Sequence, residues 1–554
     1  MMSSRATFSQ FEQKSVYLVT LDWYVHNLLY RDMKKLVVSL VAFLVSGLFL
    51  FGFSQDFGNS SAAFDVEKDS IYIPFEFRGA WLSTVESIDW PKVKIHLTRQ
   101  TKEDGSVESS SEMKARISKE REQQKKDLVG LINAIKRTGC NAVMFQVVSN
   151  TDALYPSKIL QWAPSLTDIP GEGPGYDPLA LAVKIAHSLG MQIHAWINPL
   201  RIGKVDFPRR EDNICYVKKE LVQEHNGRLY WDPGNPQMRE YLGNLATEIM
   251  SKYELDGLHI DDYFYPDGLK GSGEQAKSKN GEKVWDDEAL FKKYGNGKTL
   301  DQWRESNIDE IVKVMHEAVH KTRPDAVFGV SPAGRLVNTQ ALYADPRNWA
   351  RQGTIDYLIP QIYWQHGHAI ADFKKVLDSW SGILEDVPVI VGMAAYRYKS
   401  KAFPEFSEYE LQVKECREAP YLEGPERQNV IGQCWFTTHS IIGDEFTSKM
   451  LNTFYQDETL TPNIGNGGNI LQSPEVFRMG NHLRWGEVKN ADSFAVYRLE
   501  DSGQRTSSGG VVWKAVFKEN FHGFIYKCRE AGNYFVLACK GGSHSQRSNV
   551  IFIK

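Results

Sequence analysis

The sequence lacks the short motifs that mark several common enzyme classes. No Gly-rich phosphate loop opens a helix, and no G-x-S-x-G nucleophile elbow is present. The sequence therefore carries no signature of phosphate-loop chemistry or of acyl transfer at a serine elbow. For the same reason we expect no cofactor.

Cysteine is also scarce. The 554 residues include six cysteines, and no two of them have the C-x-x-C spacing of a metal-binding motif. Cys140 and Cys434 border or occupy apolar strand-like runs, so we expect buried free thiols there. Cys528 and Cys539 lie in the C-terminal region, where a disulfide is compatible with the spacing but not required by it.

A strong excess of charge of either sign is absent. The formal net charge is −4, which leaves no basic footprint for a nucleic-acid partner. A hydrophobic content of 42% and a charged content of 24% are ordinary for a folded soluble protein, and the length suggests two or three domains. Aromatic residues are abundant at 12%, a mild indication of rings that stack on sugars or fill cores.

One long hydrophobic run, residues 36–53, follows two consecutive lysines. This order is typical of a secretory signal, and the run is long enough for an uncleaved membrane anchor. We expect residues 1–32 to be an upstream extension, 33–55 a signal peptide or anchor, and 56–75 a polar linker. The protein is then exported to the periplasm, the cell envelope or the exterior, and contacts the membrane only through an uncleaved N-terminal segment.

Residues 76–455 alternate between short apolar strands and helical segments, which predicts an α/β fold whose parallel sheet closes as a (β/α)8 TIM barrel. The predicted strands are Arg78–Thr84, Asn141–Val148, Met191–Ile197, Asp256–Asp261, Ala326–Ser331, Ile355–Tyr363, Val389–Ala394 and Ile431–Thr437. Insertions follow the first four strands, in the loops that build the active sites of barrels. A linker at 456–470 then leads to residues 471–554, whose short β-type runs predict a small sandwich.

The stretch Asp256–Pro266 carries the strongest functional signal. Because strand side chains alternate between two faces, its apolar residues share one face, while His259 and Asp261 share the other. Asp261 is therefore the last inward residue of a buried parallel strand, and Asp262 follows it. Carboxylates at that end of a strand are costly to bury without a task. The alternative is an Asp that only caps a helix or fixes a loop.

The same alternation gives a polar and aromatic inner face to five strands. The residues assigned to it are Met144, Gln146, Val148, Gln192, His194, Trp196, Asn198, His259, Asp261, Gln361, Tyr363, Gln433, Trp435 and Thr437. A polar residue satisfied within the core would explain any one of them. Five strands with one bias predict a shared pocket for a hydrophilic ligand.

Two kinds of chemistry fit such a pocket. His194, His259 and Asp261 lie on adjacent strands as metal ligands would, but the His-x-His pair of barrel hydrolases is missing from the first strand. We therefore expect no metal, and favour glycoside hydrolysis, which needs two carboxyl groups beside the anomeric carbon. Asp261 is the predicted nucleophile or charge stabiliser. The proton donor stays open among three candidates: Asp262, Glu86 and Asp152.

Several motifs resemble those of the glycosyl-hydrolase-like family 10, formerly a domain of unknown function. They are Arg78-Gly-Ala-Trp-Leu-Ser-Thr84 with Asp89-Trp-Pro91, Phe145-Gln-Val147, Asp152-Ala-Leu-Tyr-Pro-Ser157, His194-Ala-Trp-Ile-Asn-Pro-Leu-Arg201, Trp231-Asp-Pro-Gly-Asn-Pro236, Asp256–Pro266, Ser331-Pro-Ala-Gly-Arg335 and Pro360-Gln-Ile-Tyr-Trp364. The resemblance covers about residues 76–450. It implies a TIM barrel in a bacterial envelope or secreted protein that hydrolyses polysaccharide, with peptidoglycan glycan strands one proposed substrate. The C-terminal region resembles the fibronectin type III-like domain that accompanies the family.

Strand pattern and resemblance together predict a substrate-binding set. Its members are Trp81, Gln146, Tyr155, His194, Trp196, Asn198, Arg201, His259, Tyr263, Tyr265, Arg335, Gln361, Tyr363, Trp364 and Trp435. Two classes of function remain open: a glycoside hydrolase, and a non-hydrolytic glycan-binding protein that uses the barrel mouth for recognition. Both predict a polysaccharide or oligosaccharide partner.

Overall fold

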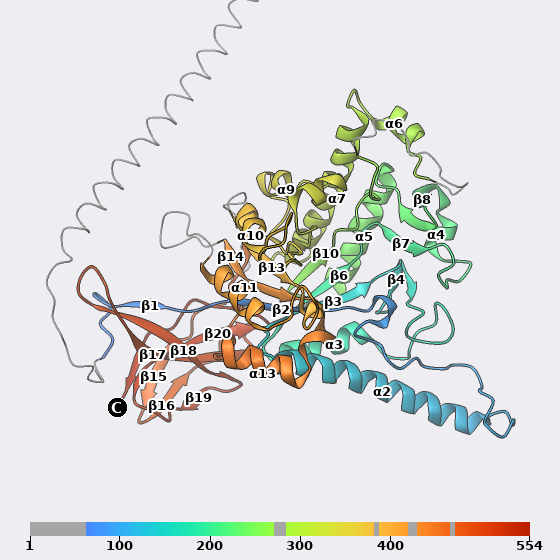
Figure 1. Ribbon diagram of the computed structural model, residues 1–554. Helices are drawn as coiled ribbons and strands as arrows, with labels where there is room; N and C mark the ends of the chain where they lie inside the picture. The colour runs from blue at the N-terminus through green and yellow to red at the C-terminus, as the bar shows by residue number, and fades with distance from the viewer. Residues whose placement is uncertain (1–62, 271–283, 382–386, 419–428, 466–470) are drawn as a thin grey trace, which may run out of the picture. The chain divides into compact units, whose positions relative to one another are not determined.

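The computed structural model of the protein describes residues 63–554 except 271–283, 382–386, 419–428 and 466–470 (Figure 1). The predictions for residues 1–32 and 33–55 fall outside the described residues. Within the described ranges, no helix has both the length and the apolar character needed to cross a membrane.

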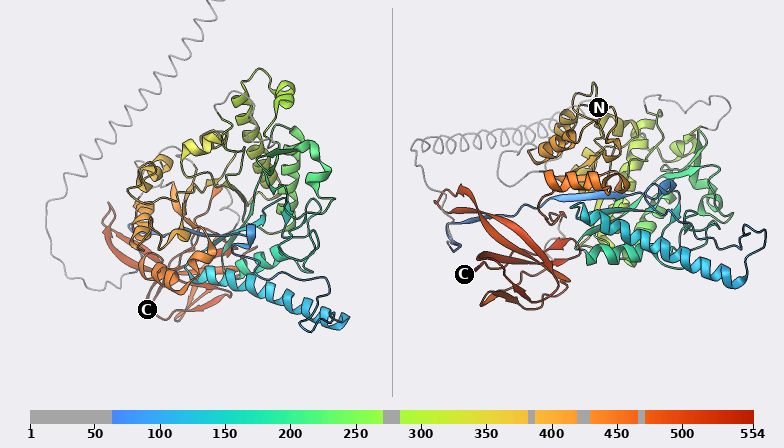
Figure 2. Two further views of the ribbon diagram at one scale, coloured as in Figure 1. Left: turned by 45° about the vertical axis from the view of Figure 1, so that its right-hand side comes forward. Right: turned by 60° about the horizontal axis from the view of Figure 1, so that its bottom comes forward.

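Eight parallel strands close into a barrel, which confirms the predicted (β/α)8 fold. Along the barrel wall they are β2 (Phe77–Leu82), β3 (Ala142–Val148), β6 (Gln192–Ile197), β10 (Gly257–Ile260), β11 (Val327–Val330), β12 (Tyr357–Leu358), β13 (Val389–Met393) and β14 (Val430–Trp435). The longer helices are α2 (Ser110–Arg137), α3 (Pro178–Ser188), α5 (Pro236–Lys252), α7 (Leu300–Thr322), α10 (Phe373–Ser381), α11 (Ser407–Glu418) and α13 (Asp444–Thr453). Figure 2 shows helices surrounding the strands.

The loops at the carboxyl ends of the strands carry short elements of their own. They are η1 (Val85–Ser87), β4 (Asp152–Ala153), β5 (Gln161–Trp162), β7 (Arg201–Lys204), α4 (Ile214–Val217), η2 (Lys219–Leu221), β8 (Val222–His225), β9 (Arg228–Trp231), α6 (Glu288–Tyr294), α8 (Leu336–Ala341), α9 (Pro346–Gln352), η3 (Ala395–Arg397) and α12 (Thr438–Ile441). The elements after β2, β3, β6 and β10 fill the predicted insertions.

Local sequence signals start the long helices. Asp177 caps α3 and is followed by Pro178 in the first turn, and Asn235-Pro236 does the same for α5. Thr299 and Gln302 form a capping box at the start of α7. These caps fix where each insertion ends and the chain turns back along the barrel.

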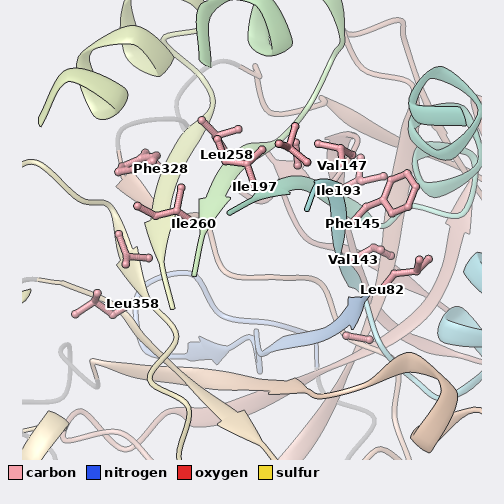
Figure 3. Packing of buried hydrophobic residues seen from close by; sticks show 14 of the residues in the cluster. Leu82, Val143, Phe145, Val147, Ile193, Ile197, Leu258, Ile260, Phe328 and Leu358 are labelled. Atoms are coloured by element: carbon pink, nitrogen blue, oxygen red, sulfur yellow. The ribbon is translucent and has the colours of Figure 1, made fainter. Parts of the chain in front are cut away.

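An apolar layer between the strands and the helices holds the barrel together. Val143, Phe145 and Val147 of β3 point into this layer, and so do Leu258 and Ile260 of β10 (Figure 3). All five are fully buried, and each such side chain contributes about 1.5–3 kcal/mol relative to exposure. The predicted helix-facing sides of these two strands are therefore confirmed, and the opposite sides face the barrel interior.

The inward position predicted for Trp435 on strand β14 is not observed. Cys434 packs in the interior cluster, whereas Trp435 packs in the outer layer with the helices. Trp435 is fully buried there and stacks on Phe454, with 5.7 Å between the ring centroids. Its indole N–H donates to the hydroxyl of Tyr455 at 3.0 Å. The predicted substrate contact of Trp435 is thus wrong, because its ring lies behind the barrel wall.

The reason lies in the neighbouring glutamine. Gln433 was assigned to the interior because it is polar, but its Oε1 accepts a hydrogen bond of 3.0 Å from the hydroxyl of Tyr455 on the helix side. A polar residue satisfied by a distant tyrosine cannot be recognised from the strand pattern. The carbonyl oxygen of Gln433 therefore points toward the helices, and Trp435, two residues further on, shares its face.

A buried ion pair anchors the insertion after β10. Asp287 and Arg304 form a bidentate pair, with N–O distances of 2.8 and 2.9 Å, and neither side chain is exposed. The Arg304 guanidinium also donates to the hydroxyl of Tyr343 at 3.1 Å. The cluster ties the segment before α6 to helix α7, next to the carboxyl end of β10.

The C-terminal region is all-β, as predicted. One sheet contains β15 (Val476–Met479), β16 (His482–Trp485) and β19 (Ile525–Lys527), and a larger one contains β17 (Ser493–Arg505), β18 (Val511–Phe521), β20 (Gly532–Lys540), β21 (Ser543–His544) and β22 (Ile551–Ile553). Leu483 and Trp485 of the first sheet share a buried cluster with Val496 and Val536 of the second. The two sheets therefore pack face to face. The closer resemblance to a fibronectin type III domain stays a prediction.

Part of the predicted linker belongs to this region. β1 (Ser70–Tyr72) pairs in parallel with β18. Ile71, Ile73 and Phe75 pack on the face of the larger sheet that points away from the smaller sheet. The prediction of a linker over residues 56–75 is therefore wrong at its C-terminal end. The alternating apolar residues there are those of an added strand.

All six cysteines are free and buried. The expectation of buried thiols at Cys140 and Cys434 is confirmed. Cys528 and Cys539 do not form the disulfide that their spacing left open.

Candidate active site

Asp261 and Asp262 directly follow β10, at the carboxyl ends of the barrel strands. Asp261 is 3% exposed, and its Oδ2 accepts a hydrogen bond of 3.1 Å from Nε1 of Trp196. Its Oδ1 has no hydrogen-bond partner among the described residues. The backbone N–H of Tyr263 also hydrogen-bonds to this carboxyl. Two donors offset only part of the cost of ionising a carboxyl that is buried.

The two carboxyls differ in their titration. Burial raises the pKa of Asp261 to about 8, against the charge of Arg201, and the charge of Asp262 adds to the rise. Burial also raises the pKa of Asp262, opposed by a hydrogen bond from Gln361 and by the charge of Arg201. The raised pKa keeps a proton on Asp261 at neutral pH.

A cleft of about 500 Å³ opens beside the pair. Asp262 and Tyr263 line it together with Arg201, Arg228 and Tyr230 from the small sheet after β6. The guanidinium carbon of Arg201 lies 3.4 Å from the centroid of the Tyr263 ring. Because Tyr263 is 39% exposed, this stacked pair offers a ligand both an aromatic face and hydrogen-bond donors.

Gln361 and Tyr363 follow β12, which ends at Leu358, so the strand is shorter than the predicted Ile355–Tyr363 and neither residue belongs to it. Tyr363 packs partly against the outer apolar layer. Gln361 hydrogen-bonds to Asp262. Tyr363 stacks on Phe436 with 5.9 Å between the ring centroids, and Tyr396 meets both rings edge-on at the same distance. Tyr363 also lies close enough to Asp262 for that charge to raise its pKa, although burial is the larger cause.

Four residues of this mouth were not predicted. Phe436 and Tyr396 belong to the aromatic group, and Arg228 and Tyr230 to the cleft. A signal was present for Tyr396, since it follows the seventh predicted strand directly and strand carboxyl ends face the site. No local signal points to Arg228 or Tyr230, because their hairpin belongs to an insertion without a barrel period.

Gln146 and Asn198 shape the mouth from within. Oε1 of Gln146 accepts hydrogen bonds from the backbone N–H groups of Thr84 and Val85, each at 2.9 Å, and its amide donates to Asn198 at 3.2 Å. These bonds hold the loop in which Glu86 has a left-handed backbone, with φ of 51°. Because Gln146 is fully buried, it positions this loop, and its predicted ligand contact is corrected. Glu86 itself is exposed.

Below the mouth, ring side chains form a continuous hydrogen-bond chain. Nε1 of Trp81 donates to Nε2 of His259 at 3.2 Å. The Tyr357 hydroxyl lies 3.3 Å from Nδ1 of His259 and 2.9 Å from Nδ1 of His194, whose Nε2 lies 3.2 Å from Oε1 of Gln192. With both imidazoles neutral, every donor in the chain has an acceptor.

This chain gives His194 and His259 a structural task. Burial holds the pKa of His194 near 4 and that of His259 well below its ordinary value, so both are neutral. Each of their ring nitrogens has a protein partner, and neither converges on Asp261 as a metal ligand would. The predicted substrate contacts of Trp81, His194 and His259 are corrected, since these side chains form the packed floor of the pocket.

Three predicted site residues are occupied elsewhere. Asp152 is 5% exposed and accepts a hydrogen bond of 3.0 Å from the backbone of its own loop. Tyr155 is fully buried and donates to Glu248 of α5 at 3.0 Å. Tyr265 borders the cleft but is buried, and its hydroxyl accepts from Asn307 of α7 at 3.1 Å. The sequence motifs contain these residues, but their polar atoms face helices and loops rather than the cleft.

Arg335 and Trp364 lie at a neighbouring hollow. Arg335 lines a cavity of about 290 Å³ together with His368 and Ile370. The Trp364 ring lies 6.3 Å from that of His368 and packs partly against the outer layer. Neither residue lines the cleft beside Asp262.

A closed parallel barrel with paired carboxyls at its mouth is an arrangement that glycoside hydrolases use. The chain belongs to the family described as glycosyl hydrolase-like 10, whose model matches residues 76–407. The family resemblance drawn from the motifs is therefore confirmed.

The chain is also similar in sequence to two bacterial proteins named as glycosyl hydrolases. The chain is 29% identical to the glycosyl hydrolase YngK of Bacillus subtilis (strain 168) over 473 residues, 78% of this chain and 84% of that one. It is 31% identical to the glycosyl hydrolase DigH of Escherichia coli (strain K12) over 350 residues, 58% of this chain and 73% of that one. Among solved structures, the PgaB (BpsB) glycoside hydrolase domain of Bordetella bronchiseptica aligns with a TM-score of 0.40 and 13% identity, over 62% of this chain and 95% of that one.

Proposed function

We propose that the protein is an exported glycoside hydrolase that cleaves glycosidic bonds in a polysaccharide, with peptidoglycan glycan strands as its substrate. The observation that carries this proposal is the pair Asp261 and Asp262 beside a cleft of about 500 Å³ lined by aromatic and arginine side chains. Family membership and the glycosyl hydrolase relatives support the reaction class.

The pair supplies the two roles that the reaction needs. Glycoside hydrolysis uses one carboxylic acid that protonates the leaving oxygen and one carboxylate that faces the anomeric carbon. With its pKa near 8, Asp261 holds a proton at neutral pH, and Trp196 orients the carboxyl that bears it. Asp262 lines the cleft and receives hydrogen bonding from Gln361. We therefore assign the proton donor to Asp261 and the charged carboxylate to Asp262, the reverse of the order suggested by the strand pattern alone.

The cleft also offers a place for the sugar. The Tyr263 ring and the Arg201 guanidinium stacked on it present a flat surface beside Asp262. Arg228 adds a second cation to the same cleft. Asp262 and Asp267 also line the cleft, so its charge is mixed. The two arginines can pair with carboxylates of a glycan, such as those of peptidoglycan strands from which the stem peptides have been removed.

The test is a screen of the purified protein against denuded peptidoglycan and a panel of neutral polysaccharides, with new reducing ends as the readout. We expect release from denuded peptidoglycan, and loss of release in Asp262→Asn. Tight glycan binding by the wild type without any reducing ends would favour a glycan-binding protein instead. Sequencing the N-terminus of protein from the native envelope tests export, and the mature chain should begin shortly after residue 53.

A further inference from the structure

Three side chains with metal-ligating atoms meet at the end of the barrel opposite the carboxylate pair. His316 and His320 lie four residues apart on α7, and so on one face of the helix. Asp356 directly precedes β12, at the amino end of that strand. One ligand atom from each of the three lies within 4.8 Å of the others.

The distances between these side-chain atoms are close to the distances between the ligand atoms of a bound metal ion. Nε2 of His320 lies 2.8 Å from Oδ2 of Asp356, and Nε2 of His316 lies 3.8 Å from Oδ1. Bonds of about 2.0–2.1 Å in a tetrahedral site separate ligand atoms by about 3.3 Å. That value falls between the two distances, and the three ligand atoms lie within 4.8 Å of one another.

Asp256, which precedes β10, occupies a position equivalent to that of Asp356 and shows the structural role that such an aspartate has without a metal. Asp256 accepts hydrogen bonds from the backbone N–H of Ile193 at 2.8 Å and from His187 at 3.0 Å. Asp356 makes the equivalent bonds to the backbone N–H of Phe328, at 2.6 Å, and to His320. Strand bracing therefore accounts for one aspartate and one histidine at each place.

His316 is the addition that strand bracing does not explain. With His316, Asp356 has two histidine neighbours, His316 and His320, whereas Asp256 has one, His187. The side chains of the triad are 13–31% exposed, so an ion has a path to the site and a water can complete its coordination.

The ligand set selects the kind of metal. Two imidazoles and one carboxylate suit Zn²⁺ and other late divalent transition metals, whereas Mg²⁺ and Ca²⁺ prefer oxygen ligands. We propose that His316, His320 and Asp356 bind a late divalent transition metal such as Zn²⁺, which clamps α7 to the start of β12. Because the site lies at the amino ends of the strands, the ion is structural and takes no part in chemistry at the mouth.

The test compares metal-depleted wild type with His316→Gln, which leaves the brace between His320 and Asp356 intact. Zn²⁺ binding is measured by equilibrium dialysis, and the melting temperature is followed with and without Zn²⁺. We expect the wild type to bind one more equivalent than His316→Gln, and to gain a few degrees of melting temperature that the variant does not gain. His187→Gln, at the matched place, should keep the full Zn²⁺ response.

Circular dichroism shows whether each variant is folded, and His320→Gln replaces His316→Gln if the latter is not. Equal Zn²⁺ stoichiometry and equal thermal response in wild type and variant would overturn the proposal. Chelation should lower the melting temperature and leave hydrolysis of a glycan substrate unchanged. A loss of turnover on chelation in the folded protein would refute the structural role.

Discussion

Trp196 donates one hydrogen bond of 3.1 Å to Asp261, and the second oxygen of that carboxyl has no partner among the described residues. The arrangement leaves Oδ1 of Asp261 able to carry a proton in a buried place at the barrel mouth. With the pKa raised by burial to about 8, Asp261 keeps its proton at neutral pH, as the proposed proton donor must, and its neighbour Asp262 lines the cleft. In the proposed mechanism, the proton donor and the charged carboxylate are therefore neighbours in the chain that differ in their environments.

The first prediction concerns the two carboxyls. Asp261→Asn removes the proton donor, which should lower the hydrolysis rate about 10²–10⁴-fold and keep glycan affinity, since the amide has the same shape. Asp262→Asn should lower the rate at least as much. Rates and affinities of the two variants are measured side by side. Full activity in either variant would refute the assigned roles.

The second prediction concerns Trp196. Its indole N–H bonds to the carboxyl and lowers the pKa of Asp261, against burial. Trp196→Phe removes this donor, so the pKa should rise further and the alkaline limb of the kcat profile should move to higher pH. Trp81→Phe is the matched control, because Trp81 donates to His259 instead. A limb that moves equally in both variants, or in neither, contradicts the link.

The third prediction follows from linkage. The folded pKa of Asp261 lies above the unfolded value, so between about pH 4 and pH 8 the folded state binds more protons than the unfolded state. Stability therefore falls as pH rises, by up to about 1.4 kcal/mol per pH unit. Asp261→Asn lacks this titration. Its advantage in melting temperature over the wild type should grow toward pH 8 and then level off, and a constant difference would count against the raised pKa.

The barrel was predictable from the sequence, and much of its inner face was not. Alternation put Asp261 on the face of His259, opposite Leu258 and Ile260, because burial of the apolar side forces the register. It does not apply to Gln361 and Tyr363, which lie beyond the end of β12. It failed at Trp435, where the neighbouring glutamine is satisfied by a tyrosine 22 residues further along the chain. Tyr155 failed for another reason: its motif is intact, but its hydroxyl bonds to a helix that the motif does not contain. Such long-range partners leave no trace in a local pattern.

The fourth prediction concerns the ion pair behind the cleft. Asp287→Asn leaves the Arg304 guanidinium buried without its counter-charge, which should cost about 3–5 kcal/mol of unfolding free energy. The exposed pair of Lys399 and Glu445 provides the comparison, and Glu445→Gln should leave stability nearly unchanged. Denaturant midpoints of both variants test this, and equal losses would show that burial is not the cause.

The last prediction distinguishes a residue proposed to contact the glycan, Tyr396, from a residue that stabilises the fold, Tyr155. Tyr396 is 52% exposed and meets Tyr363 and Phe436 edge-on at the mouth, so its ring is free to stack on a sugar. Tyr396→Ala should weaken glycan affinity by about 1 kcal/mol, roughly fivefold, with little change in melting temperature. Tyr155→Phe should do the opposite: loss of its buried hydrogen bond to Glu248 costs about 1 kcal/mol of stability and leaves affinity unchanged. Binding isotherms and thermal melts of both variants make the comparison. An affinity loss in Tyr155→Phe with no loss in Tyr396→Ala would move the sugar-binding surface away from the aromatic group at the mouth.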